Sequence, residues 1–303
     1  MTRRTQVALA LLPLIAATLM LSAQQEPERE GAPLNAEQIR ALVQRAIAAQ
    51  HRSDEALDEY DRTERIVYSD HDQKTTDTTS RLVPVGGGEM RVDMNRNGQP
   101  VPPAEIAQEW RDVEGMIESR THTDDPAVKK EYEKQANRRR EIAKMVDAIN
   151  DAFFFRYAGR TLREGRSVVE LDYQPNPEFK SSLRYAWAYK DVAGKVWVDE
   201  ASGCVVRLEA QLLHDIPVGG GIVGKVYSGA RMELEQAEEA PGIWLPTFSS
   251  YDVEGRKFLF PASFHRKLYA SDYRHIGPPA QALALLRSEH AQLITNSPGQ
   301  TAR

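Results

Sequence analysis

The clearest alternation of hydrophobic and polar positions in the chain runs from Cys204 to Leu212. Small or apolar residues occupy every second position there: Cys204, Val206, Leu208, Ala210 and Leu212. This period of two is typical of a strand with one buried face. A second strand, rich in β-branched and aromatic residues, precedes it at 195–198, and the polar link 200–203 ends in a glycine, as a short hairpin loop requires. The pattern predicts an antiparallel hairpin over 195–212.

Further strands are predicted on both sides of this hairpin. They cover 57–68, 75–85, 89–94, 153–162, 166–173, 231–236, 244–253 and 257–269. The predicted turns are Asn97-Gly98, Glu164-Gly165, Pro241-Gly242 and Glu254-Gly255. Strands at such regular spacing indicate a meander.

The strand at 57–68 has an unusual pattern, because Arg62 and Glu64 share a face with Tyr60, Ile66 and Tyr68. Two interpretations fit it. Either both faces of the strand meet water, or charged groups point into a cavity. The solvated face is the interpretation we favour.

Helical periodicity appears at the start of the predicted domain and in one internal excursion. Asn35 and Gln38 have the spacing of a capping box. The stripe that follows is Ile39, Leu42, Val43, Ala46 and Ile47. The excursion at 102–152 contains two apolar stripes. The first is formed by Ile106, Trp110, Val113 and Ile117. The second follows Asp125-Pro126 and is formed by Val128, Tyr132, Ile142, Val146 and Ile149. A short helix is expected at 280–286. We predict a mainly β (α+β) domain over 35–276 whose curved antiparallel sheet is covered by helices, with a helical-pair insertion.

The N-terminal segment has the composition of a secretory signal peptide over 1–23. Arg3 and Arg4 precede an apolar run that ends near Leu21, and Ala23 is a small residue at the expected cleavage site. An uncleaved anchor is the alternative, but the run is short for a membrane span and contains Pro13. A flexible spacer over 24–34 would follow, and 277–303 would form a polar tail. We expect a periplasmic protein that is not integral to the membrane after cleavage.

Composition limits the classes of partner. Hydrophobic residues make up 41% and charged residues 27% of the chain, which is ordinary for a globular protein. The formal net charge of -5 gives no reason to expect a nucleic acid or an anionic membrane surface as a partner. A single cysteine, Cys204, forms no internal disulfide, and its position in the alternating pattern indicates a small buried residue.

The search for catalytic, metal and cofactor motifs gives two partial matches. Gly219 to Lys225 fits the pattern GxxxxGK, but Val226 stands where a phosphate loop needs Ser or Thr, so no nucleotide is expected. The segment 70–74 begins like a calcium loop but lacks its later ligands, and we interpret it as a polar turn. The seven histidines have no HExxH spacing, and GxSxG is absent. We therefore expect no enzyme activity, cofactor or metal.

Four stretches carry a resemblance to a known family: GRSVVELDYQPNPEFK, KVWVDEASGCVVRLEAQL, GIWLP and YASDYRHI. Together they resemble the periplasmic outer-membrane lipoprotein-sorting family, in particular its longer relatives of acidobacterial type, over about residues 35–276. The resemblance implies a half-open antiparallel β-barrel whose concave apolar face accepts acyl chains. The residues expected to line it are Val206, Leu208, Ala210, Leu212, Met232, Leu234 and Trp244. Ile222 and Val223 lie in a loop that is either a hydrophobic lid or a mobile connector.

Three functions remain open at this stage. The first is a binding protein that holds a lipid or an acylated protein. The second is a non-catalytic envelope scaffold that docks a protein partner through the same fold. The third is a hydrolase whose catalytic residues the sequence does not reveal.

Overall fold

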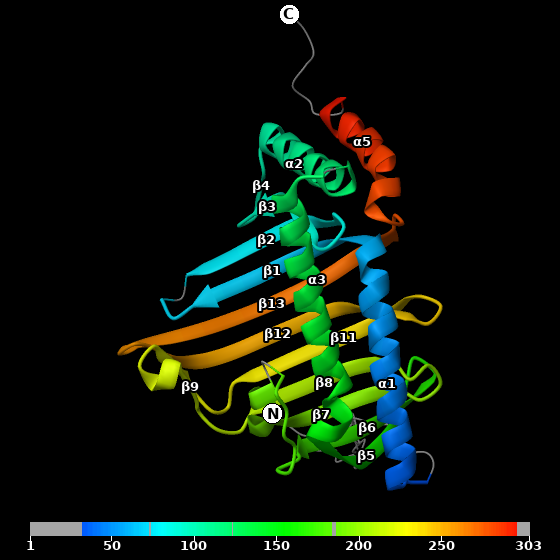
Figure 1. The fold of residues 1–303 in the computed structure, drawn as a ribbon, viewed down its shortest axis with the longest axis vertical. Coiled ribbons are helices and arrows are strands. Elements are labelled where there is room, and N and C mark those ends of the chain that lie inside the picture. Colours follow the sequence, from blue (N-terminus) through cyan, green and yellow to red (C-terminus); the bar gives the residue numbers. More distant parts are fainter. Residues whose placement is uncertain (1–31, 73, 123, 184–185, 296–303) are drawn as a thin grey trace, which may run out of the picture.

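The computed structural model describes residues 32–72, 74–122, 124–183 and 186–295 (Figure 1). The predicted signal peptide lies outside these residues. The helices are α1 (Ala36–Ala56), α2 (Pro103–His122), α3 (Pro126–Asp147), α4 (Ile149–Ala152) and α5 (Pro279–Thr295), with short 3-10 turns η1 (Leu57–Glu59), η2 (Ala186–Asp191) and η3 (Gly219–Gly221). The strands are β1 (Tyr60–Asp70), β2 (Thr75–Pro84), β3 (Glu89–Arg96), β4 (Gln99–Pro100), β5 (Phe153–Arg163), β6 (Arg166–Pro175), β7 (Val192–Asp199), β8 (Val205–Leu212), β9 (Ile216–Val218), β10 (Gly224–Val226), β11 (Arg231–Ala240), β12 (Ile243–Lys257) and β13 (Phe260–His275).

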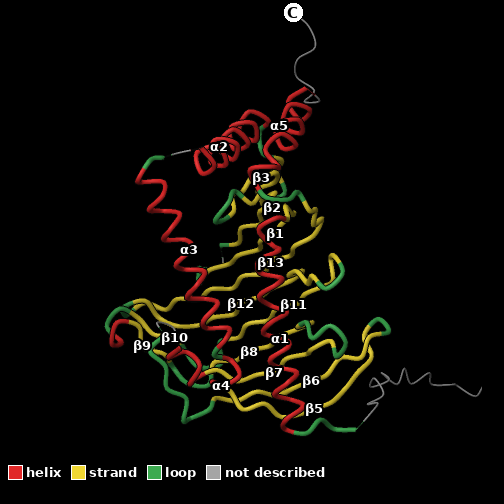
Figure 2. Tube along the Cα trace, turned by 45° about the vertical axis from the view of Figure 1, so that its right-hand side comes forward, coloured by secondary structure: helices red, strands yellow, loops and turns green. Residues whose placement is uncertain are grey.

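The strands form one antiparallel sheet in the order β4-β3-β2-β1-β13-β12-β11-β8-β7-β6-β5, and the β9–β10 hairpin is attached to β12. The sheet departs from a simple meander at two places: the β9–β10 hairpin is inserted between the neighbours β8 and β11, and β1 pairs with β13, which brings the two ends of the domain together. Within the described residues, β4 and β5 have no outer neighbour, so the sheet is open. The predicted fold class, a curved antiparallel sheet covered by helices, is confirmed (Figures 1 and 2).

The strand register defines the two faces of the sheet, because residues directly opposite each other in neighbouring strands point to the same side. We call the side under α1 the inner face. The inner face can be followed from strand to strand, because the register places these residues opposite one another in successive strands: Leu171, Val196, Leu208, Leu234, Ser249, Leu268 and Ile66.

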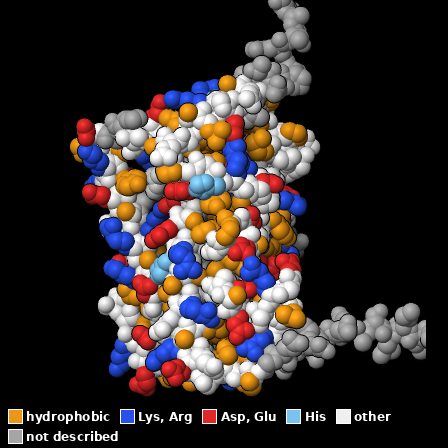
Figure 3. Space-filling view, turned by 90° about the vertical axis from the view of Figure 1, so that its right-hand side faces the viewer, with side chains coloured by type: hydrophobic (Ala, Val, Ile, Leu, Met, Phe, Trp, Pro, Cys, Tyr) orange, Lys and Arg blue, Asp and Glu red, His pale blue; other side chains and the backbone are white. Residues whose placement is uncertain are grey.

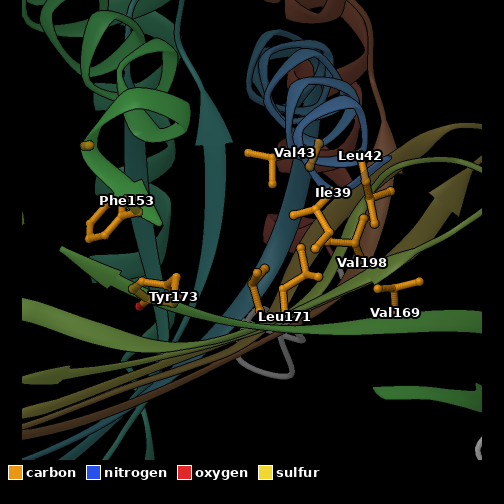
Figure 4. Close-up of a cluster of buried hydrophobic side chains, with 11 residues drawn as sticks. Ile39, Leu42, Val43, Phe153, Val169, Leu171, Tyr173 and Val198 are labelled. Carbon is orange, nitrogen blue, oxygen red and sulfur yellow. The ribbon is translucent and has the colours of Figure 1, made fainter. Parts of the chain in front are cut away.

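One hydrophobic core lies between α1 and the inner face of β5 to β8 (Figure 4). The predicted capping box starts α1, since the Gln38 backbone N–H donates to Asn35 Oδ1 and the Asn35 N–H donates to Gln38 Oε1, both at 2.9 Å. The predicted stripe of α1 then packs onto the sheet. Its buried members are Ile39, Leu42, Val43 and Ala46, which meet Val169, Leu171, Val196 and Val198. Cys204 is buried beside this core, as predicted.

A second core lies on the opposite face, at the other end of the sheet. Val83 belongs to that face because it alternates with Leu82, which the register places opposite Arg62 on the inner side. The predicted stripe of α2 packs here together with α5. The buried members are Val83, Val85, Val92, Trp110, Val113, Ile117, Ile276, Ala282 and Leu286. The short helix expected at 280–286 is therefore part of a longer, packed helix.

Helix α3 is less covered than its pattern predicts. The Asp125 carboxylate accepts a hydrogen bond from the Ala127 N–H at 2.8 Å, so the predicted start is correct. None of the residues from Pro126 to Asp147 is buried, however, and Tyr132 and Ile142 are 45% and 48% exposed. The expected apolar stripe of this helix thus forms no closed core. In Figures 1 and 2, α3 runs across the strands on the same side as α1.

Polar contacts hold α3 in this position. Arg139 Nη2 donates to Asp58 Oδ1 at 2.7 Å, and His51 Nε2 lies 2.7 Å from Asp147 Oδ1. The neighbouring arginines 138 and 140 are exposed, as expected for a solvated face.

Two local predictions were wrong. The segment 57–59 is a 3-10 turn and not the start of a strand. Gly255 lies inside β12 and not in a turn; a Cβ atom there would lie 2.3 Å from the Lys225 carbonyl oxygen. This glycine allows β10 to approach β12, and the hairpin turn instead falls at Phe258, whose φ is 54°.

Candidate functional site

The middle of the inner face is apolar but only partly covered. The side chains there come from strands β8, β11, β12, β13 and β1. None of them is fully buried, and all except Phe264 are at most about a third exposed. They are Leu208, Ala210, Met232, Leu234, Tyr251, Val253, Phe264, Leu268, Ile66 and Tyr68. We call this set the open stretch. Contiguous exposed apolar surface of this kind marks binding sites more often than scattered apolar residues do.

Aromatic rings form the part of the open stretch that is farthest from the α1 core. The ring centroids of Tyr68 and Phe264 are 5.4 Å apart, and those of Phe264 and Tyr251 are 6.5 Å apart. Rings at these distances make favourable edge or offset contacts, so this part of the surface is preorganised.

The structure places the predicted lining residues in two groups. Leu208, Ala210, Met232 and Leu234 belong to the open stretch. The other three are closely packed. Leu212 and Trp244 are buried, and Val206 packs against the small cluster that contains Trp244.

Sequence reasoning did not assign a lining role to six members of the open stretch: Ile66, Tyr68, Tyr251, Val253, Phe264 and Leu268. The sequence showed by alternation that Ile66 and Tyr68 lie on the same face of their strand. Their neighbours Arg62 and Glu64, however, pointed to a solvated strand.

The charged residues of β1 form a buried network on the same face, and the favoured solvated interpretation was wrong. Arg62 and Glu64 are only 6% and 3% exposed. Arg62 lies 2.7 Å from Glu64 and donates to both carboxylate oxygens of Glu89 at 2.5 and 2.9 Å. Arg91 Nη2 donates to Glu64 Oε2 at 2.8 Å. Burial opposes the charge of Arg62, but the hydrogen bond to Glu89 and the charges of both glutamates outweigh it and raise the pKa.

Ile222 and Val223, the predicted lid residues, extend the sheet instead of covering the inner face. They lie in the turn between β9 and β10, and β10 pairs with the end of β12. The Phe258 N–H donates to the Val223 carbonyl at 2.8 Å, which attaches this hairpin to the turn between β12 and β13.

Two grooves are present beside the open stretch. One of about 620 Å³ has a mixed lining, with charged side chains of the outer face that include Asp172, Lys195 and Glu233 together with Ala210 and Met232 of the open stretch. The other, of about 460 Å³, contains His265, whose Nε2 lies 3.3 Å from Glu254. In the part of the chain that the structure describes, no three His, Cys, Asp or Glu side chains are arranged to hold a metal ion.

The partial sequence matches have structural explanations. Lys225 belongs to β10 and pairs with Asp215 at 2.9 Å, and the strand begins where a phosphate loop would need a helix. Asp70 Oδ1 accepts hydrogen bonds from the Asp72 and Lys74 N–H groups at 3.0 and 3.2 Å, which is the geometry of a polar turn. Burial raises the pKa of the Cys204 thiol, which disfavours the thiolate.

The solved structures that are similar to this chain include lipoprotein-sorting proteins. One is an outer membrane lipoprotein-sorting protein domain from Vibrio parahaemolyticus, with 8% identity and a TM-score of 0.30 over 81% of this chain and 99% of that one. A DUF1329 family protein from Desulfovibrio piger has 10% identity and a TM-score of 0.29 over 78% and 92%. A LolA superfamily protein from Nitrosomonas europaea has 10% identity and a TM-score of 0.28 over 76% and 92%.

These structures include proteins of the family that the sequence resembles. Similarity at this level carries no argument about the ligand, which depends on the open stretch itself. No protein-family model and no curated protein matches the chain. Among the described helices, none has the length and apolar content needed to cross a membrane.

Proposed function

We propose that this chain is a periplasmic, non-catalytic binding protein that holds an acyl chain, from a lipid or an acylated protein, on the open stretch of its inner face. The observation that carries the proposal is the extent of this surface. Ten apolar side chains on five adjacent strands share one face and remain partly accessible, and Ser249 and Arg266 are interspersed among them on that face.

The energetics favour an apolar ligand. Each methylene group that leaves water contributes about 0.8 kcal/mol, so several methylenes provide useful affinity without a polar anchor. Most of this surface, such as Leu208, Leu234 and Leu268, offers a polar or charged ligand no hydrogen-bonding partner, which is costly. Ser249 and Arg266 are the polar side chains interspersed on the face.

Helix α3 supports the same proposal. It exposes Tyr132 and Ile142 and is attached through polar contacts at its C-terminal half instead of through a packed core. A helix held in this way can move relative to the sheet at a lower cost than α1, whose stripe is buried. Such a movement would adapt the space over the open stretch to the ligand.

The direct test is binding of a fluorescent fatty acid, combined with native mass spectrometry and organic extraction of protein purified from the periplasm. We expect a co-purified lipid or acylated peptide, and saturable binding of the fatty acid. Leu208→Arg should weaken binding strongly because it places a charge on the open stretch. Gln211→Arg is the matched control, since it introduces the same side chain on β8 from an exposed outer-face position and should leave binding unchanged.

A second variant keeps the test informative if Leu208→Arg does not fold. Met232→Trp adds volume without charge and should reduce binding in a protein with native circular dichroism. Bare protein that fails to bind the fatty acid would refute the proposal. If such a protein also formed a stable complex with an envelope protein, the scaffold function would replace it.

A further inference from the structure

A cluster of large hydrophobic side chains is exposed where two hairpins meet at one end of the sheet. It contains Leu259 (89% exposed), Ile222 (78%), Phe260 (74%), Phe258 (52%) and Val223 (45%). We call this cluster the apolar tip. In Figure 1 it belongs to the hairpin ends near the label β9, at the left of the sheet.

The opposite end of the sheet has a different character. The turns there include Glu164-Gly165, between β5 and β6, and Pro241-Gly242, between β11 and β12, which are typical polar hairpin turns. Figure 3, which views the molecule from that side, shows acidic and basic side chains interspersed with hydrophobic ones. The concentration of exposed apolar groups is therefore specific to one end of the sheet.

The apolar tip is a built feature and not a loose loop. Arg256 Nη2 donates to the Gly221 carbonyl at 2.9 Å, and the Phe258 N–H donates to the Val223 carbonyl, so each hairpin fixes the other. Phe258 has a φ of 54°, a conformation that glycine or asparagine adopts far more readily than an aromatic residue.

The geometry points to a lipid bilayer as the occupant, and we propose that the apolar tip inserts into the interfacial region of a membrane. The tip is a narrow pair of hairpin ends, which suits insertion between lipids better than burial against a flat protein surface. The exposed Lys257 directly precedes the apolar triplet 258–260, where its aliphatic stem can follow the apolar surface while its charge reaches the headgroups. Because the chain has a net charge of -5, apolar insertion and not long-range attraction must drive the binding.

The tip also lies next to the open stretch. From Phe260 the strand β13 leads to Phe264 on the inner face, a distance of about 13 Å along the strand. Insertion of the tip would therefore bring the end of the open stretch to the bilayer surface. The docking proposal goes beyond the proposed function and does not depend on what the inner face holds.

The test is co-sedimentation of protein purified from the periplasm with vesicles of phosphatidylcholine, alone or mixed with phosphatidylglycerol. We expect binding to both, with little loss at high salt, because apolar insertion is not screened. The double variant Leu259→Asn/Phe260→Asn should bind about a hundredfold more weakly, since each large apolar side chain contributes at least about a factor of ten when it is buried.

The control is Phe154→Asn/Leu162→Asn, which removes two exposed apolar side chains from the edge strand β5 and should not change vesicle binding. All four side chains are more than half exposed, so the variants should fold. Fatty-acid binding in solution should be the same in both, which separates this test from that of the proposed function.

Three results would overturn the docking proposal. One is an absence of vesicle binding by the unmodified protein. Another is an equal loss in both double variants. The third is self-association that disappears only in the Leu259/Phe260 variant without any vesicle binding, which would make the tip a contact between two copies of the chain.

Discussion

Replacing Arg62 by methionine should destabilise the protein strongly, because it removes one partner from a buried ion-pair network. Arg62 is buried between Glu64, at 2.7 Å, and Glu89, which it contacts through two nitrogens. Glu64 would keep only Arg91, which is itself partly exposed. Breaking a buried pair in this way costs about 3–5 kcal/mol. At about 1.4 kcal/mol per factor of ten, the folding equilibrium constant should fall by about two to four orders of magnitude.

The measurement is the free energy of unfolding from urea denaturation at neutral pH, followed by circular dichroism. The double variant Arg62→Met/Glu64→Leu should recover much of the loss, since replacing both buried charges by apolar groups of similar size is often close to neutral. Comparison of the single variant with the double variant therefore separates the cost of an unpaired charge from the loss of packing.

The matched control lies on the same strand but on the other face. Arg65 pairs with Asp77 at 2.6 Å, and its side chain is exposed to solvent. Arg65→Met should change the stability very little, as expected for a surface pair. Equal effects of Arg62→Met and Arg65→Met would refute the assignment of Arg62 to the buried inner face.

Two further predictions concern stability. Gly194→Ala should destabilise the protein by about 1–3 kcal/mol, because its Cβ would lie 1.9 Å from the Glu209 carbonyl oxygen. Gly115→Ala, in an open position on α2, should instead stabilise the protein by about 0.5–1 kcal/mol, so thermal melts of the two variants should show opposite shifts. Burial raises the pKa of Tyr189 to about 12, so its contribution to stability is complete below the unfolded pKa of about 10 and is lost as the pH rises from 10 to 12. The free energy of unfolding should decrease more steeply over this range in the unmodified protein than in Tyr189→Phe, and identical slopes would contradict the assigned burial.

The sequence was sufficient where one face of a strand is uniformly apolar. Cys204 to Leu212 alternates without a charged residue on its inner face, so local periodicity predicted the strand and its buried side. The capping box at Asn35 was equally predictable, because both of its partners lie within one helical turn.

The failures involve partners that are distant in the sequence. Arg62 and Glu64 looked solvated because their counterions, Glu89 and Arg91, lie on β3 and meet them only after the sheet forms. Gly255 was assigned to a turn because no local pattern reveals that β10 approaches it.

The prediction that the apolar stripe of α3 is buried was wrong for a different reason. Its spacing is correct for an amphipathic helix, yet the surface that should cover it is not supplied by this chain in the described residues. An apolar stripe shows that a helix has an apolar side, but it does not show whether the chain itself or a ligand covers that side.

The inner face changes character across the sheet, and this change limits how an acyl chain can lie. On one side the face is closed by the α1 core, where residues such as Leu171 are fully buried. At the end of β1 that is remote from the apolar tip, it meets Arg62 and Glu64, whose network would lose hydrogen bonds if an apolar chain displaced them. The open stretch itself covers five strands, which span about 19 Å at the usual strand spacing.

A ligand that meets the packed α1 core across the sheet and the charged network at the start of β1 can shift mainly along the strands toward their other ends. At one end of β12 and β13, that direction leads past Phe264 to the apolar tip. The opposite ends carry polar turns, so an apolar chain leaving that way would enter water. If both proposals hold, fatty acid bound to the protein should transfer to vesicles more slowly in Leu259→Asn/Phe260→Asn, although its affinity in solution is unchanged. Equal transfer rates would mean that the tip is not on the path of the ligand.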